Sequence, residues 1–421
     1  MDDFQYHGQE LFLEKIPVQK IASEIGTPFY LYSYNTILNH LRVFTNAFKE
    51  IPHLICFAEK ANSNIAVLRI FIKEGGGLDI ISGGELYRAL QASADPQKIV
   101  YAGVGKTRDE IRYALKSNIL MFNIESTQEL FVIDEVAEEL NTKARVALRI
   151  NPDVDPKTHK YIATGLKDSK FGFSIANAVQ EYQLAERLEN IDVVGIHKHI
   201  GSQITQTAPF VDAVEKIISL ADVLKKEGID IKYLNVGGGL GITYNDESPP
   251  HPKELAAELV PILSKTDYTI IFEPGRVIVG NAGILVTKVL YTKINEGKNF
   301  IVVDAGMNDF IRPSLYDSYQ RILPVTKPEA SDKITADVVG PICESGDFLA
   351  KDRILPNFQK DNLIAVMSAG AYGFTMSSNY NSRCRVPEVL VKDDQHYVIR
   401  GREEYTDLIK GEKIPEFLNH G

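Results

Sequence analysis

A repeated pattern in the middle of the chain constrains its fold most strongly. From about residue 54 to residue 276, short apolar or β-branched runs end in glycine, serine, asparagine or a charged residue, and a stretch of helical periodicity follows each run. The runs occupy residues 54–60, 77–82, 98–103, 119–126, 144–151, 192–202, 231–239 and 269–276. Eight strands alternating with helices predict an α/β fold, a (β/α)₈ barrel of the TIM type, because open doubly wound sheets usually contain fewer strands. One connection, residues 152–174, is long and lacks a clear period, and long ordered loops are more often functional than accidental.

The pattern changes after residue 280, where strand-like segments follow one another without long helices between them. These segments lie at residues 300–307, 336–345, 363–373 and 385–401. Such a succession of strands predicts a second, β-rich domain with a sandwich-like or barrel-like form. Residues 29–34 also read as a strand, so the N-terminal segment is expected to join this domain. We therefore expect a barrel domain at residues 35–280 and a discontinuous β-rich domain at residues 1–34 and 281–421.

Composition and charge restrict the partners. The 421 residues include 46 basic and 56 acidic side chains, and the formal net charge of -10 disfavours binding to nucleic acid or to anionic lipid. The N-terminal residues are acidic and polar, which is not typical of a secretory signal, and no run approaches the ~18 apolar residues of a membrane-spanning helix. The three cysteines lack C-x-x-C spacing, so we expect a reduced, cytoplasmic protein without a structural zinc.

Chemically reactive residues fall where the predicted barrel strands end, which is where working residues lie in this fold. These strand-end residues are Lys60, Ser82, Arg149, His199, Gly237 to Gly239 and Glu273 to Arg276. Lys60 directly follows a buried run, where desolvation would favour the free amine that forms a Schiff base. Taken alone, a strand-end lysine that reaches solvent is the more common interpretation.

A glycine cluster, GGGLG at residues 237–241, ends the seventh predicted strand. Glycines let backbone N–H groups approach an anion closely, and barrels commonly bind phosphate near strands 7 and 8. Ile242 stands where the third glycine of a dinucleotide motif would be, so a dinucleotide site is disfavoured. Taken alone, a tight turn explains the cluster equally well.

The sixth and eighth strands end in two further motifs, HKHIGSQ (197–203) and EPGR (273–276). The EPGR segment offers a carboxylate acceptor and an anion-binding arginine side by side, although an ion pair in a turn is the plainer interpretation. His197 and His199 share one face of their strand, whereas Lys198 points the other way. The two histidines have metal-ligand spacing, but no third ligand supports a metal site, and strand histidines are usually core residues.

Together, these residues supply the parts of a pyridoxal phosphate site: an imine-forming lysine, a phosphate cradle, a carboxylate for the pyridinium proton and an imidazole that can stack on the ring. With these parts assembled, the chain resembles the alanine-racemase-like family of pyridoxal-phosphate-dependent decarboxylases over about residues 10 to 400. The resemblance rests on FAEKAN (57–62), GLDIISGGELYRAL (77–90), TGLKDSKFG (164–172), HIGSQ (199–203), GGGLGI (237–242), EPGR (273–276), DAGMNDFIRPSLY (304–316), VVGPICES (338–345) and AGAYGFTMSSNYNSR (369–383). Two small departures are Glu59 before the lysine and Gln320 where a histidine is common.

The resemblance implies a role for each site residue. Lys60 is expected to carry pyridoxal 5′-phosphate, His199 to stack on its ring and Glu273 to pair with the ring nitrogen. The residues expected to hold the phosphate are Ser202, Gly237, Gly238, Gly239, Pro274, Gly275 and Arg276, with Tyr372 nearby. The residues expected to bind substrate are Arg276, Arg312 and Tyr316 for a carboxylate and Glu344 for an amine, together with Tyr372. Cys343 is expected to donate the proton, and it would come from the second subunit of a homodimer with shared active sites.

The resemblance further implies decarboxylation of meso-diaminopimelate to L-lysine and CO₂, the last step of lysine biosynthesis. A carboxylate at Glu273 favours decarboxylation over racemisation, because it keeps the pyridinium proton in place. The alternatives are a decarboxylase of ornithine, arginine or carboxynorspermidine, and a barrel that binds the cofactor without turnover and would lack the β-rich domain. A metal-dependent hydrolase is a weaker alternative, suggested only by the two histidines.

Overall fold

The computed structural model describes residues 3–156, 170–328 and 332–418. Its contacts divide the chain into two compact units, one formed by Thr36–Gly280 and the other by Met1–Asn35 together with Asn281–Gly421. Part of the long connection at 152–174, and residues 164–169 of the TGLKDSKFG motif, lie outside the described residues. None of the helices in the described ranges has the length and apolar character needed to cross a membrane.

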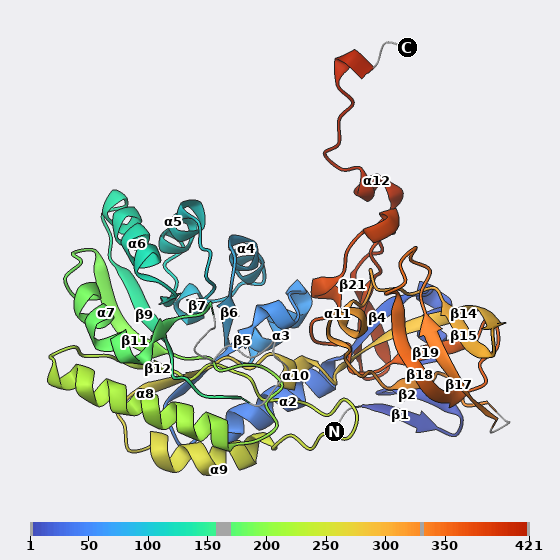
Figure 1. The fold of residues 1–421 in the computed structure, drawn as a ribbon, viewed down its shortest axis with the longest axis horizontal. Coiled ribbons are helices and arrows are strands. Elements are labelled where there is room, and N and C mark those ends of the chain that lie inside the picture. The colour runs from blue at the N-terminus through green and yellow to red at the C-terminus, as the bar shows by residue number, and fades with distance from the viewer. Residues whose placement is uncertain (1–2, 157–169, 329–331, 419–421) are drawn as a thin grey trace. The chain divides into compact units, whose positions relative to one another are not determined.

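The first unit is a closed barrel of eight parallel strands, which confirms the predicted fold (Figure 1). The strands follow the order β9-β11-β12-β13-β5-β6-β7-β8, and pairing of β8 with β9 closes the ring. Their bounds are β5 (His53–Ala58), β6 (Gly77–Ile80), β7 (Ile99–Tyr101), β8 (Met121–Ile124), β9 (Ala144–Asn151), β11 (Ile191–His197), β12 (Tyr233–Asn235) and β13 (Thr269–Phe272). A two-residue strand, β10 (Phe173–Ser174), extends the edge of β9.

Helices cover the outside of the barrel strands (Figure 1). Their bounds are α2 (Tyr34–Ala47), α3 (Ile65–Lys73), α4 (Gly83–Gln91), α5 (Arg108–Lys116), α6 (Thr127–Glu139), α7 (Ala178–Ala185), α8 (Ala208–Lys226), α9 (Pro252–Leu263) and α10 (Arg276–Val279). Five of them begin at side-chain N-caps, and four of these caps, Asn64, Ser82, Thr107 and Ser126, lie in short loops that follow the strands; the fifth is His251 of α9. Each cap satisfies a backbone N–H that the first helical turn leaves without a partner, so these short loops end at a defined residue.

The second unit is β-rich, as predicted. One sheet follows the order β18-β17-β15-β14-β4-β20-β21, with β19 pairing with β14 and β16 with β19, and a small sheet has the order β1-β2-β3. The bounds are β1 (Phe4–His7), β2 (Glu10–Leu13), β3 (Ile16–Pro17), β4 (Phe29–Ser33), β14 (Gly283–Asn295), β15 (Lys298–Val303), β16 (Ile322–Pro324), β17 (Lys333–Val339), β18 (Phe348–Pro356), β19 (Leu363–Val366), β20 (Glu388–Lys392) and β21 (Gln395–Arg400). The predicted N-terminal strand at 29–34 is therefore β4, and it lies between β14 and β20.

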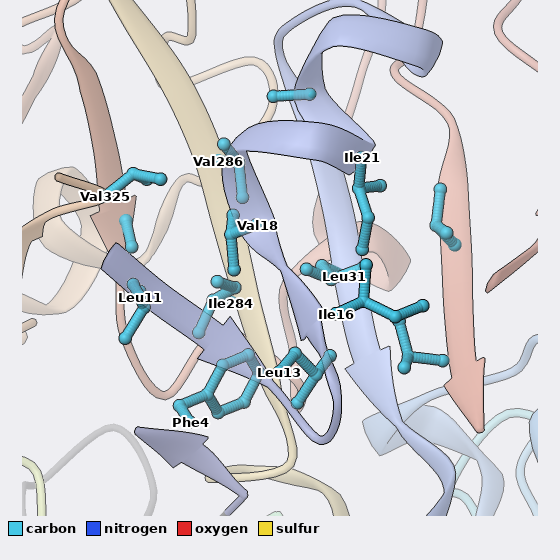
Figure 2. Packing of buried hydrophobic residues seen from close by; sticks show 14 of the residues in the cluster. Phe4, Leu11, Leu13, Ile16, Val18, Ile21, Leu31, Ile284, Val286 and Val325 are labelled. Atoms are coloured by element: carbon cyan, nitrogen blue, oxygen red, sulfur yellow. The ribbon is translucent and has the colours of Figure 1, made fainter. Parts of the chain in front are cut away.

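The N-terminal segment also supplies part of the core of this unit. Figure 2 shows Leu11 and Leu13 of β2 and Val18 of helix α1 (Val18–Ile25) packed near Ile284 and Val286 of β14. All five side chains are buried. Apolar burial at about 25 cal/mol per Å² is the main stabilising contribution here, so the N-terminal residues belong energetically to the β-rich unit.

Several barrel strands are shorter than predicted. The run at 231–239 forms only the three-residue strand β12, and the run at 192–202 ends as a strand at His197. Gly237 and Gly239 have φ values of +66° and +121°, which a strand does not allow, so the glycine cluster forms a turn above the barrel. This shortening leaves the motif residues in the loops at the C-terminal ends of the strands.

Candidate active site

A cavity of about 530 Å³ opens at the C-terminal ends of the barrel strands. Six side chains singled out from the sequence line it, namely Lys60, Ser82, Arg149, His197, His199 and Glu273. Its size lies within the range of about 300–1,000 Å³ that is typical of small-molecule and cofactor sites. The barrel therefore brings together residues that are more than 200 positions apart in the sequence.

Lys60 lies in a single 3₁₀ turn, Glu59–Ala61, directly after β5. Its Nζ is 2.7 Å from Oδ2 of Asp79, whose side chain is fully buried, while the lysine side chain is 32% exposed. The lysine is thus held by an ion pair and is less desolvated than the sequence suggested. Burial raises the pKa of Asp79, the nearby charge of Glu273 adds to this, and Lys60 opposes it. Asp79 was missed from the sequence, although an acidic residue inside the apolar strand β6 is a recognisable signal.

Glu273 follows β13 and is buried. Its Oε1 accepts hydrogen bonds from Nδ2 of Asn235 at 2.6 Å and of Asn123 at 3.3 Å, and its Oε2 lies 3.3 Å from Nε2 of His197. Burial alone would raise the pKa of Glu273, but His197 and Lys60 hold it below its ordinary value. The carboxylate is therefore ionised and fixed in one orientation. The two asparagines were also missed from the sequence.

The two strand-six histidines have different neighbours. Burial lowers the pKa of His197, so this ring is neutral and donates from Nε2 to Glu273. Burial also lowers the pKa of His199 well below its ordinary range, and its Nδ1 accepts the backbone N–H of Gly238 at 3.2 Å. A neutral imidazole on the cavity wall is suited to stacking on an aromatic ring. Across the described ranges, no group of three or more histidine, cysteine or carboxylate side chains is arranged to hold a metal ion.

The glycine cluster is required by close backbone packing. A Cβ on Gly238 would lie 2.0 Å from the carbonyl oxygen of Glu273, and one on Gly239 would lie 2.4 Å from that of Gly201. Beside this turn, the buried guanidinium of Arg276 donates to Oγ of Ser202 at 3.1 Å and to the hydroxyl of Tyr244. The structure thus places a hydroxyl and a buried arginine beside the glycine turn, two donors that suit a phosphate.

These residues fit pyridoxal phosphate. The wall of one cavity carries a primary amine on Lys60, a neutral imidazole on His199 and an ionised, buried carboxylate on Glu273. Nδ1 of His197 and Oδ1 of Asp79 are buried here without a hydrogen-bond partner among the described residues, as expected where a site is completed by a ligand or water.

The remaining motif residues lie in the β-rich unit, where three of them form one group. Arg312 and Tyr316 begin and end helix α11 (Arg312–Tyr316), and the guanidinium carbon lies 5.5 Å from the ring centre of Tyr316. The same carbon lies 5.9 Å from the ring centre of Tyr372, a residue with φ of +55°. A left-handed tyrosine is a strained conformation of the kind that is often found at functional sites.

Cys343 and Glu344 are exposed and are each held by a neighbouring residue that sequence reasoning missed. The backbone N–H of Cys343 donates to Oδ1 of Asn381 at 2.8 Å, and the hydroxyl of Tyr380 donates to Oε2 of Glu344 at 3.0 Å. Both partners belong to the AGAYGFTMSSNYNSR motif (369–383), so the motif match was the available signal.

Comparisons with known proteins agree with the motif resemblance. Residues 34–280 match the family model described as "Pyridoxal-dependent decarboxylase, pyridoxal binding domain". The chain is 52% identical to the diaminopimelate decarboxylase of Vibrio cholerae over 410 residues, which cover 97% of this chain and 98% of the relative. Diaminopimelate decarboxylase from Helicobacter pylori, solved with L-lysine, is similar with a TM-score of 0.90 and 43% identity over 93% of this chain and 98% of that one. The M. jannaschii structure, also with L-lysine, gives a TM-score of 0.94 and 37% identity over 99% of both chains. The chain belongs to the diaminopimelate decarboxylase family of pyridoxal-dependent decarboxylases.

Proposed function

We propose that this chain decarboxylates meso-diaminopimelate to L-lysine and CO₂ with pyridoxal 5′-phosphate as its cofactor. The observation that carries the proposal is the single cavity in which the amine of Lys60 and the buried, ionised carboxylate of Glu273 meet. By the family resemblance, that pair would supply both the attachment point of the cofactor and the partner of its ring nitrogen. The barrel unit would bind the cofactor, and the β-rich unit would contribute to the active site and to the dimer interface.

The chain's own residues would divide the chemistry between them. When bound, pyridoxal phosphate supplies a protonated pyridine ring that withdraws the electrons left behind by CO₂. Glu273 would accept a hydrogen bond from the ring N–H and keep that proton in place, because its own pKa is held low. His199 would lie against the ring face, and Ser202, Arg276 and the Gly237–Gly239 turn would hold the phosphate.

The proposed substrate follows from charge matching at its distal end. One carboxylate leaves, so the distal end must be recognised as an amino acid, with both a carboxylate and an ammonium. Arg276, Arg312 and Tyr316 would bind the carboxylate, and Glu344 would bind the ammonium. Ornithine and arginine carry only a cation at that end, and an unmatched buried charge costs several kcal/mol, so discrimination by orders of magnitude is expected.

Replacing Arg312 by alanine should therefore weaken use of meso-diaminopimelate severely while relaxing discrimination against ornithine. The measurement is kcat/KM for meso-diaminopimelate, ornithine, arginine and carboxynorspermidine, with the amine product identified alongside released CO₂. Arg108→Ala is a matched control, because Arg108 is exposed and pairs with Glu135 and Glu139 on the helix surface. The proposed function fails if the unmodified protein uses ornithine or arginine as efficiently as meso-diaminopimelate.

We further propose a homodimer in which Cys343 of one copy donates the proton in the site that contains Lys60 of the other copy. This assignment rests on the family resemblance and on the exposure of the Cys343 thiol. A cytoplasmic location is part of the same proposal, since Cys56, Cys343 and Cys384 form no disulfide.

Mixing two inactive variants should restore activity if the sites are shared. A heterodimer of Lys60→Ala and Cys343→Ala chains contains one site with both residues intact and one site with neither. Random exchange of subunits in a symmetric dimer should then give about a quarter of the unmodified activity. Mixing two preparations of the same variant is the control. If mixed dimers form, as mass spectrometry would show, and no activity returns, the shared site is wrong.

A further inference from the structure

Lys198 is a buried lysine to which the proposed chemistry assigns no role. It follows β11 between His197 and His199, and it points to the opposite side of the strand end from the cofactor cavity. The residue is only 1% exposed and is among the largest fully buried side chains of the described chain. Its Nζ lies 5.6 Å from the ring centre of Phe210 on α8.

The side chain of Lys198 ends in a narrow pocket directly behind the glycine turn. The pocket has a volume of about 20 Å³, enough for about one water molecule and too small for a substrate. Gly237, Gly238 and Gly239 line one side of it, and apolar side chains, including Phe44 and Phe210, line the rest. One turn of backbone therefore borders both the pocket that holds this amine and the place proposed for the cofactor phosphate.

The surroundings of Lys198 disfavour its charged form. Apart from Lys198 itself, the described residues that line the pocket from α2, α8, α9 and the strand ends carry no ionisable side chain. Burial lowers the pKa of Lys198 to about 7, and Glu273 is the charged group that opposes this shift. His197 and His199, its chain neighbours, are neutral and add no positive charge above acidic pH. At pH 8 the amine is thus mostly uncharged.

We propose that Lys198 is a proton-linked counter-charge for the cofactor phosphate: its amine takes up one proton from solvent when a phosphate dianion binds on the glycine turn. The inference rests on the proposed function, because it requires the phosphate to lie at Gly237–Gly239. A dianion behind a thin layer of backbone acts strongly in an apolar pocket, where the effective dielectric constant is low. Lys198 would thereby strengthen cofactor binding without touching the cofactor.

Calorimetry with an aldehyde-free analogue tests this directly. Pyridoxine 5′-phosphate cannot attach to Lys60, and at pH 8 its phosphate is already a dianion. Titrating it into the full-length, cofactor-free protein, in buffers of different ionisation enthalpy, counts the protons exchanged on binding. We expect the unmodified protein to take up most of one proton. Lys198→Met should take up none and should bind about tenfold more weakly, because it lacks the positive charge that proton uptake places near the phosphate.

Two controls separate this inference from a structural role and from the proposed function. Lys216→Met removes a half-exposed lysine of α8 and should leave the proton uptake unchanged. Proton uptake by the unmodified protein should also be smaller at pH 6.5, where Lys198 is already largely protonated. This measurement uses the unmodified protein alone, so it does not depend on whether a variant folds. Equal proton uptake by the unmodified protein and Lys198→Met, or no proton uptake by the unmodified protein at pH 8, would overturn this inference and leave the proposed cofactor site standing. Failure of the analogue to bind the unmodified protein would instead overturn the proposed cofactor site.

Discussion

Replacing Lys60 by alanine is expected to abolish both covalent attachment of the cofactor and turnover. The amine of Lys60 lies on the cavity wall and is aimed by its ion pair with Asp79, 2.7 Å away. Alanine removes the nucleophile, and no ordinary side chain can substitute for it in forming an imine. Borohydride reduction followed by peptide mass spectrometry should place the cofactor on the Lys60 peptide of the unmodified protein and on no peptide of the variant.

Two matched variants make this test specific. Lys216→Ala removes a partly exposed lysine of α8 and should keep both the visible absorbance and the activity. Asp79→Asn should keep the cofactor but attach it more slowly, because the amide no longer holds the lysine through an ion pair. Reduction that fixes the cofactor to any other lysine of the unmodified protein would show that Lys60 is assigned wrongly.

The barrel and the sites at its strand ends could be predicted because their signals are local. The predicted strand at residues 144–151 has the bounds of β9, since its apolar and β-branched residues, interrupted by Arg145 and Arg149, form a compact run that ends at Asn151. The run at 231–239 was predicted too long, because hydrophobicity alone does not reveal where Gly237 adopts a positive φ.

The polar residues that support the site could not be predicted in the same way, because their partners come from distant strands. Asn123 of β8 and Asn235 of β12 both donate to Glu273, which follows β13. β8 and β13 are separated in the sheet by β5, β6 and β7, so Asn123 meets Glu273 only across the interior of the closed barrel. Each asparagine reads in sequence as one polar residue in an apolar run, and its function appears only when the ring closes.

Replacing Glu273 by glutamine should leave the cofactor bound but lower kcat by roughly 10²–10⁴-fold, the usual effect of losing a proton-positioning group. The amide has nearly the same shape, so the hydrogen bonds from Asn235 and Asn123 to Oε1 can remain. Its NH₂ group, however, cannot accept a hydrogen bond from the pyridine N–H, so the ring loses its proton and withdraws electrons poorly.

The contact with His197 adds a second expected effect of Glu273→Gln, on stability. In the unmodified protein its Nε2 faces Oε2 of Glu273, and its Nδ1 has no partner among the described residues. A glutamine NH₂ at that place would force the ring to carry its proton on Nδ1, which leaves a buried N–H unsatisfied at a cost of about 1–3 kcal/mol. We therefore expect Glu273→Gln to be less stable to denaturant as well as slow, and His197→Phe combined with Glu273→Gln to recover stability without recovering kcat.

The pH dependence separates the proposed role of Glu273 from that of a titrating acid. Its pKa is held below the ordinary glutamate value, so its contribution to stability is complete above the unfolded-state pKa of about 4.3 and is lost as the pH falls from there through the lower folded-state pKa. The carboxylate is thus ionised throughout the working pH range. Any fall of kcat at acidic pH should therefore remain in Glu273→Gln, because Glu273 does not cause it. The contrary outcome is a Glu273→Gln protein with full cofactor content by absorbance and a kcat close to that of the unmodified protein. It would mean that the ring nitrogen is protonated without this carboxylate, and that the proposed electron withdrawal does not depend on Glu273.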